Sequence, residues 1–146
     1  MKKLIALTMT LTFLLSCICS SYAFAAQPEE TEPYASSYFA TYAVELSDAG
    51  SGKVKVEYNV KGKSSVEEVG VKKIIVQEKN GSTWDDVKTY TSSNYPSFIV
   101  KGTTLAKGSV TYSGDEGSTY RAKVTFYAKD ASGSATKTST SSSLTV

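Results

Sequence analysis

Two segments of the chain alternate strictly between apolar and polar residues, and this pattern constrains the fold more than any other feature. They are "KVKVEYNVKG" (53–62) and "YRAKVTFYAK" (120–129). Successive side chains of a β-strand point to opposite faces of a sheet, so a period of two predicts a strand with one buried face. In the second segment we assign Tyr120, Ala122, Val124, Phe126 and Ala128 to the core, and Arg121, Lys123, Thr125, Tyr127 and Lys129 to the outer face.

Weaker forms of the same pattern extend over most of the chain. The segment 37–47, "SYFATYAVELS", predicts a first strand with Tyr42, Val44 and Leu46 on one face and Phe39 on the other. We expect short strands at 98–100 and 109–114, and an edge strand of Thr and Ser within 134–146. About seven strands with turn residues between them predict an all-β protein, a single immunoglobulin-like antiparallel β-sandwich.

The best hairpin signal is the dipeptide Asn80-Gly81, which lies between "KKIIVQEK" and "TWDDVKTY". Asn and Gly both tolerate a positive φ, so we expect them at the two central positions of a type I′ turn. Trp84 follows directly and is placed to pack across the strand pair.

The N-terminal residues have the composition of an export signal. Lys2 and Lys3 precede an uncharged, largely apolar run that ends in small residues at Ala23 and Ala25. We expect residues 1–25 to be a signal peptide, with cleavage after Ala25 or Ala26, and the protein to be secreted. The alternatives are a membrane tether through an uncleaved signal, or through a lipidated Cys17 in "LLSC". An acidic, proline-containing segment at 26–37 predicts a disordered linker before a domain at 38–146.

The composition excludes several chemistries. The chain has no histidine, and its two cysteines, Cys17 and Cys19, both lie in the predicted signal. A Ser-His dyad, a thiolate nucleophile, a disulfide framework and a His/Cys zinc site are therefore excluded for the mature chain. We expect no cofactor and no metal. Without Lys2 and Lys3 the mature chain carries equal numbers of basic and acidic residues and a single arginine, which argues against nucleic acid as a partner.

The segment "GSTYRAKVTFYAKDASGSATKTS" (117–139) resembles the fibronectin type III branch of the immunoglobulin-like superfamily. The resemblance implies that Tyr120 is a corner tyrosine, whose hydroxyl bonds to the backbone just upstream. Three further segments, together with the predicted signal, carry a second resemblance: "YFATYAVELS" (38–47), "IIVQEKNGSTWDDVKTY" (74–90) and "VTYSGDEGSTYRAKVTFYA" (110–128). Through them nearly all of the mature chain resembles an uncharacterised family of small exported proteins of Gram-positive gut bacteria. That second resemblance implies no activity.

We expect a non-enzymatic module that binds an extracellular protein or glycan, without membrane insertion after signal cleavage. Aromatic side chains stack on sugars and anchor protein interfaces. One alternative is a cell-envelope component that self-assembles through polar edge strands such as "TKTSTSSS". Another is a small hydrolase that uses carboxylates from separate loops, with Asp85, Asp86, Asp115 and Glu116 as the candidates. The candidate binding face consists of Trp84, Tyr90, Tyr95, Arg121 and Tyr127.

Overall fold

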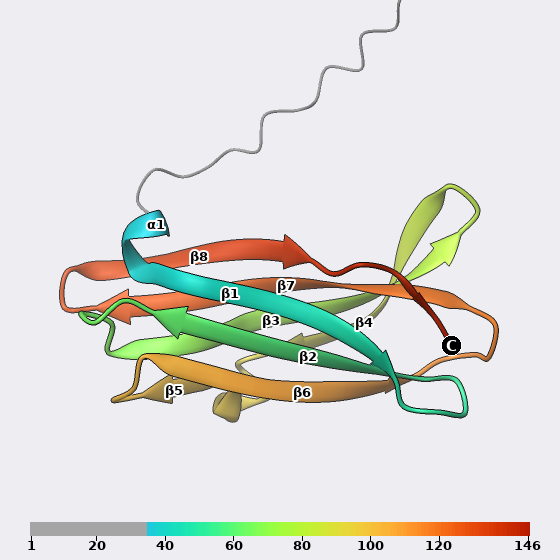
Figure 1. The fold of residues 1–146 in the computed structure, drawn as a ribbon, viewed down its shortest axis with the longest axis horizontal. Coiled ribbons are helices and arrows are strands. Elements are labelled where there is room, and N and C mark those ends of the chain that lie inside the picture. Colours follow the sequence, from blue (N-terminus) through green and yellow to red (C-terminus); the bar gives the residue numbers. More distant parts are fainter. Residues whose placement is uncertain (1–34) are drawn as a thin grey trace, which may run out of the picture. The chain divides into compact units, whose positions relative to one another are not determined.

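The computed structural model describes residues 35–146, and within them the chain is built of two antiparallel β-sheets packed face to face (Figure 1). The predicted signal peptide, Cys17, Cys19 and all but the last three residues of the predicted linker lie outside the described residues. A single helical turn, α1 (Ala35–Tyr38), leads into the first strand. The predicted all-β fold with two packed sheets is thus confirmed.

The smaller sheet has three strands in the order β1-β2-β6. These are β1 (Phe39–Asp48), β2 (Lys53–Gly62) and β6 (Leu105–Ser113). The last strand begins earlier than the predicted strand at 109–114, and it includes Gly108, which pairs with Tyr58 of β2. A Cβ atom at Gly108 would lie 2.8 Å from Cζ of Tyr58, so the missing side chain makes room for the buried ring.

The larger sheet has six strands, with β4-β3-β7-β8 as its main path. Two short strands extend it, since β5 pairs with β3 and β9 pairs with β7. A 3₁₀ turn, η1 (Pro96–Phe98), comes directly before β5. The strands are β3 (Glu68–Asn80), β4 (Thr83–Thr91), β5 (Ile99–Lys101), β7 (Thr119–Asp130), β8 (Gly133–Thr140) and β9 (Leu144–Thr145). The predicted Thr/Ser edge strand is confirmed as β8.

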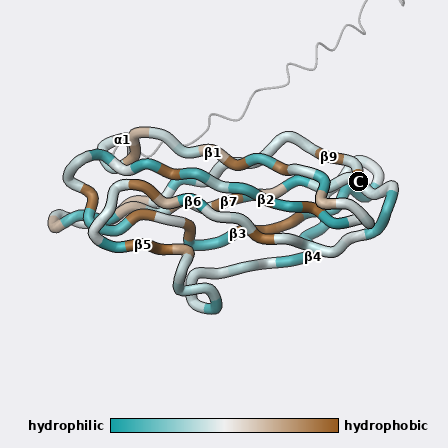
Figure 2. The backbone as a smooth tube through the Cα atoms, turned by 60° about the horizontal axis from the view of Figure 1, so that its bottom comes forward, coloured by the Kyte–Doolittle hydropathy of each residue, from teal (hydrophilic) through white to brown (hydrophobic). Residues whose placement is uncertain are grey.

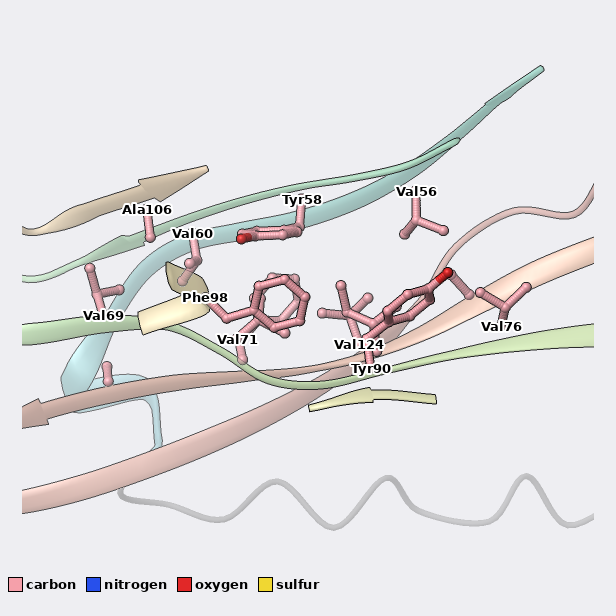
Figure 3. Close-up of a cluster of buried hydrophobic side chains, with 14 of the residues drawn as sticks. Val56, Tyr58, Val60, Val69, Val71, Val76, Tyr90, Phe98, Ala106 and Val124 are labelled. Carbon is pink, nitrogen blue, oxygen red and sulfur yellow. The ribbon is translucent and has the colours of Figure 1, made fainter. Parts of the chain in front are cut away.

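The core lies between the two sheets, and the inward residues predicted for 53–62 and 120–129 form much of it. Figure 2 shows hydrophobic and hydrophilic positions alternating along the strands, and Figure 3 shows the apolar side chains of both sheets meeting. Burial of this apolar surface is the main force that holds the sheets together. Fully buried side chains include Val54, Val56, Val60, Ile74, Val76, Tyr120, Ala122, Val124, Phe126 and Ala128.

The predicted facing of the first strand is correct only from Tyr42 onward. Phe39, which we expected on the face opposite Tyr42, Val44 and Leu46, faces the core with them and is 6% exposed. A register shift between Phe39 and Thr41 is the cause, because one extra residue reverses the alternation. Beyond it, Val44 and Leu46 pack against the core as predicted.

The predicted β3–β4 hairpin is present, but its turn lies one residue further along the chain. Asn80 pairs with Thr83, so Gly81 and Ser82 are the central residues. Only Gly81 has a positive φ, of 60°, which is the pattern of a type II′ rather than a type I′ turn. Asn80 remains in the strand, where its side-chain amide donates a 2.8 Å hydrogen bond to Asp85.

Candidate binding face

The outer face of the larger sheet carries the most one-sided charge of the described residues. By strand register, seven basic and two acidic side chains lie on it, and we call this surface the basic face. The outer face of the smaller sheet carries four basic and two acidic side chains. The basic residues are Lys72, Lys73, Lys79, Lys101, Arg121, Lys123 and Lys129, and the acidic ones are Glu68 and Asp86.

A β-bulge in β3 raises the charge of the basic face. The pairing of β3 with β7 shifts between Val71 and Lys73, so Lys72 is an extra residue in the strand. Neighbouring residues of a regular strand point to opposite faces. Here Lys73 pairs with Thr125 on the outer face, and the Lys72 ammonium also reaches that face, 4.1 Å from the centre of the Tyr127 ring. The bulge therefore places two consecutive lysines on one surface.

Arg121 of β7 and Trp84 of β4 meet across β3, which runs between their strands. The Arg121 guanidinium lies 4.3 Å from the centre of the Trp84 ring, a cation–π distance. Its Nε donates a 2.8 Å hydrogen bond to Oε1 of Gln77, and Nε2 of Gln77 donates a 2.6 Å bond to Asp86. The Arg121 guanidinium on β7 is thus held by the Trp84 ring of β4 and by the Gln77 amide of β3.

Tyr127 is on the outer face but is nearly buried, at 9% exposure. Its pairing partner on β3 is Gly70, which has no side chain, and Lys72 covers part of its ring. We expected an exposed ring here. The Tyr127 ring instead lies beneath the Lys72 ammonium and contacts it.

Tyr90 and Tyr95 lie away from the basic face. Tyr90 is 6% exposed, and Figure 3 shows its ring among the core side chains; its hydroxyl donates a 3.0 Å hydrogen bond to the carbonyl of Thr111 on the other sheet. Tyr95 is 40% exposed and stacks on Phe98 at the sandwich edge, with ring centroids 5.2 Å apart. The five predicted residues therefore do not form one surface: only Trp84 and Arg121 contact each other on the basic face.

A bulge in β4 explains why Tyr90 points inward. Trp84 and Tyr90 are an even number of residues apart, so a regular strand would place both on one face. The pairing of β4 with β3 shifts at Val87, which leaves Trp84 opposite Lys79 on the outer face and Tyr90 opposite Ile74 in the core. The expectation of an exposed Tyr90 was wrong for this reason.

Hydroxyl groups line one side of the basic face. The edge strand β8 pairs with β7 so that Thr138 is opposite Thr125 and Thr136 is opposite Tyr127. The hydroxyls of Thr125 and Thr138 lie 3.3 Å apart, within hydrogen-bonding distance. The exposed hydroxyl residues on this side of β8 are Ser134, Thr136, Thr138 and Thr140.

The outer face of the smaller sheet has an open hollow. The hollow, of about 420 Å³, has Ala43, Asn59 and Ser109 among its lining residues. Glu45 and Glu57 are opposite each other there, and Lys55 neutralises part of their charge through a 2.7 Å salt bridge to Glu57. The hydrogen bond and charge of Lys55 lower the pKa of the Glu57 carboxyl below its usual value.

The candidate carboxylates of a hydrolase come from two parts of the described chain, β4 and the β6–β7 connection. Asp85 accepts a hydrogen bond from Asn80 and Asp86 accepts one from Gln77, while Asp115 and Glu116 lie in the β6–β7 connection. Among residues 35–146, no group of three or more Asp, Glu, His and Cys side chains is arranged to hold a metal ion.

Comparison with protein-family models, with curated proteins and with solved structures finds no match for this chain. Within the described residues, no helix is long and apolar enough to cross a membrane. The fold and site are those of a two-sheet antiparallel β-sandwich with one basic outer face.

Sequence reasoning missed Lys72, Lys73 and Gln77 as residues of the candidate site. The doubled lysine in "VGVKKIIV" breaks the period of two, and this break is the one sequence signal of a bulge here. Gln77 has no signal of its own, since its role comes from its register between Asp86 and Arg121.

Proposed function

We propose that this protein is a secreted, non-enzymatic binding module that contacts an extracellular protein or glycan through the basic face. The observation that carries the proposal is the arrangement of Arg121 and Lys72. Each cation is held over an aromatic ring, of Trp84 and Tyr127 respectively, on a sheet face that needs neither group for the core. Such preorganised side chains are typical of recognition surfaces.

The same proposal includes membership of the immunoglobulin-like superfamily, and the strand order supports it. In that superfamily strands A, B and E share one sheet, and strands C, F and G share the other. Here β1, β2 and β6 form the first set, and β3, β7 and β8 the second. The Tyr120 hydroxyl accepts a 2.9 Å hydrogen bond from the Asp115 amide, as a corner tyrosine at the start of strand F does.

Blocking the face without changing its charge tests the proposal. Thr138→Trp puts a bulky ring on the exposed edge strand of the basic face, next to Thr125. Thr111→Trp is the matched control, because Thr111 is an exposed threonine on the outer side of the edge strand β6. The parent is screened against immobilised neutral and acidic glycans and against purified extracellular matrix proteins. We expect binding that Thr138→Trp weakens and Thr111→Trp retains. Blank screens, or equal losses in both variants, would contradict the proposal.

Two features at the edges of the larger sheet support a binding module over self-assembly through these edges. Lys137 of β8 pairs with the buried Phe126, so its charged side chain is on the core side of an edge strand. Inward charges and bulges on edge strands oppose pairing with another chain. The opposite edge, β4, has the bulge at Val87. We expect light scattering to show a monomer at high concentration.

A further inference from the structure

We propose that the ligand of the basic face is an acidic glycan and that Arg121 binds its carboxylate or sulfate groups through two parallel hydrogen bonds. This inference rests on the binding function proposed above. It adds the chemical class of the partner and the residue that selects it.

Both aromatic rings of this face are in contact with a cation. One face of the Trp84 ring is covered by the Arg121 guanidinium, at 4.3 Å, and the Tyr127 ring is covered by the Lys72 ammonium, at 4.1 Å. Tyr127 is in addition only 9% exposed. The two rings therefore position cations, and the groups presented to a partner are positive.

The Arg121 guanidinium is prepared for an oxyanion. Its Nε donates to Gln77 and its Cζ lies over the Trp84 ring, and its two terminal nitrogens have no hydrogen-bond partner among the described residues. Asp86, the nearest acidic group of the network, bonds to Gln77 instead. A fixed guanidinium with free terminal donors matches the two oxygens of a carboxylate or sulfate.

The remaining cations extend from Arg121 along the sheet. Lys123 is two residues further on β7, which is about 6.7 Å along a strand. Lys123 pairs with Ile75 and lies near Lys73, which pairs with Thr125. A series of positive charges along a strand complements a polymer that repeats its negative charge better than it complements a compact ligand with one anionic group.

The hydroxyl residues of β8 favour a glycan over other polyanions. Thr136, Thr138 and Thr140 border the cations of β7 and present exposed groups that both donate and accept hydrogen bonds. Sugar hydroxyls need both kinds of partner. A polyanion that is held by charge alone would not need the hydroxyl groups of β8.

The test measures the binding of the full mature chain to four polymers: alginate, dextran sulfate, neutral dextran and poly-L-glutamate. We expect binding to alginate or dextran sulfate that weakens as sodium chloride is raised, because exposed charges are screened. We expect at least about tenfold weaker binding to poly-L-glutamate and none to dextran. The stronger of the two acidic glycans identifies the acidic group.

Variants then separate Arg121 from general charge. Arg121→Lys keeps the charge but loses the planar fork, and we expect it to weaken binding about tenfold. Removing three lysines of the basic face (Lys72, Lys73 and Lys123, each to Gln) is compared with removing three exposed lysines of the smaller sheet (Lys53, Lys61 and Lys107, each to Gln). Only the first set is expected to reduce binding.

Three results would overturn the inference: equal binding to poly-L-glutamate, unchanged affinity in Arg121→Lys, or equal losses in the two lysine sets. A neutral glycan or a protein whose binding Thr138→Trp blocks would also overturn it, and would leave the proposed binding function intact. The failure of every polymer and protein in both screens would contradict both proposals.

Discussion

The guanidinium of Arg121 lies 4.3 Å from the centre of the Trp84 ring, although the two residues belong to strands that are not neighbours. The strand between them contributes Gln77, which fixes Arg121 through a hydrogen bond to Nε. Trp84 and Arg121 are the two residues of the predicted binding set that contact each other on the basic face, and their contact can be observed directly in solution.

Trp84 is the only tryptophan of the chain, so intrinsic fluorescence reports on this contact. Replacement of Arg121 by Ser uncovers one face of the indole. We expect a larger acrylamide quenching constant and an emission maximum at longer wavelength in Arg121→Ser. Lys123→Ser, which removes a charge from the same strand without touching the ring, serves as the control. Equal quenching in the parent and both variants would show that the stack is absent in solution.

Tyr120 connects the start of β7 to the preceding loop. Its buried hydroxyl accepts a hydrogen bond from the Asp115 amide and donates one of 3.4 Å to Glu78. Tyr120→Phe keeps the ring and removes both bonds, so we expect the free energy of unfolding to fall by about 1 kcal/mol. Urea denaturation of the two proteins measures this difference. An unchanged midpoint and slope would refute the structural role of the hydroxyl.

Gly70 marks a close approach between β3 and the end of η1. A Cβ atom at this position would collide with the carbonyl oxygen of Phe98, which belongs to the backbone and cannot rotate away. We expect Gly70→Ala to lower the free energy of unfolding by about 3 kcal/mol through overpacking. In Gly102→Ala the new methyl group meets open space, and only the positive φ of 69° opposes it, so a smaller loss is expected. A Gly70→Ala protein as stable as the parent would contradict this packing.

The buried tyrosines predict a loss of stability in alkali. Burial raises the pKa of Tyr58 and of Tyr90 above the usual value of about 10. The unfolded chain then releases these protons at a lower pH than the folded protein does. The free energy of unfolding therefore keeps its full value below about pH 10, and it decreases as the pH rises through and above that value. Urea denaturation between neutral and alkaline pH should show a shallower loss in Tyr58→Phe than in the parent, and parallel losses would contradict the assignment.

The strands that the sequence predicts best are those in which local pattern and tertiary pairing agree. Segments 53–62 and 120–129 each bury one face along their whole length, so their alternation alone identified the core residues. The errors arise at bulges. One extra residue near Phe39, at Lys72 or at Val87 shifts the strand pairing and reverses the facing of the residues beyond it.

The candidate site was predictable only in part for the same reason. Trp84 and Arg121 could be named from residue type, but their contact depends on the register of three strands. Tyr90 was misplaced because the bulge at Val87 is not visible in "TWDDVKTY". Lys72 was missed because a regular strand would have placed it opposite to Lys73.

Amide chemical-shift changes, recorded while alginate or dextran sulfate is added to the labelled protein, map the bound surface directly. We expect the largest changes on β3, β7 and β8, centred on Arg121 and Lys123. Around the hollow of the smaller sheet, at Asn59 and Ser109, we expect little change. Changes concentrated on β1, β2 and β6, or spread evenly over both sheets, would contradict the assignment of the basic face as the binding surface.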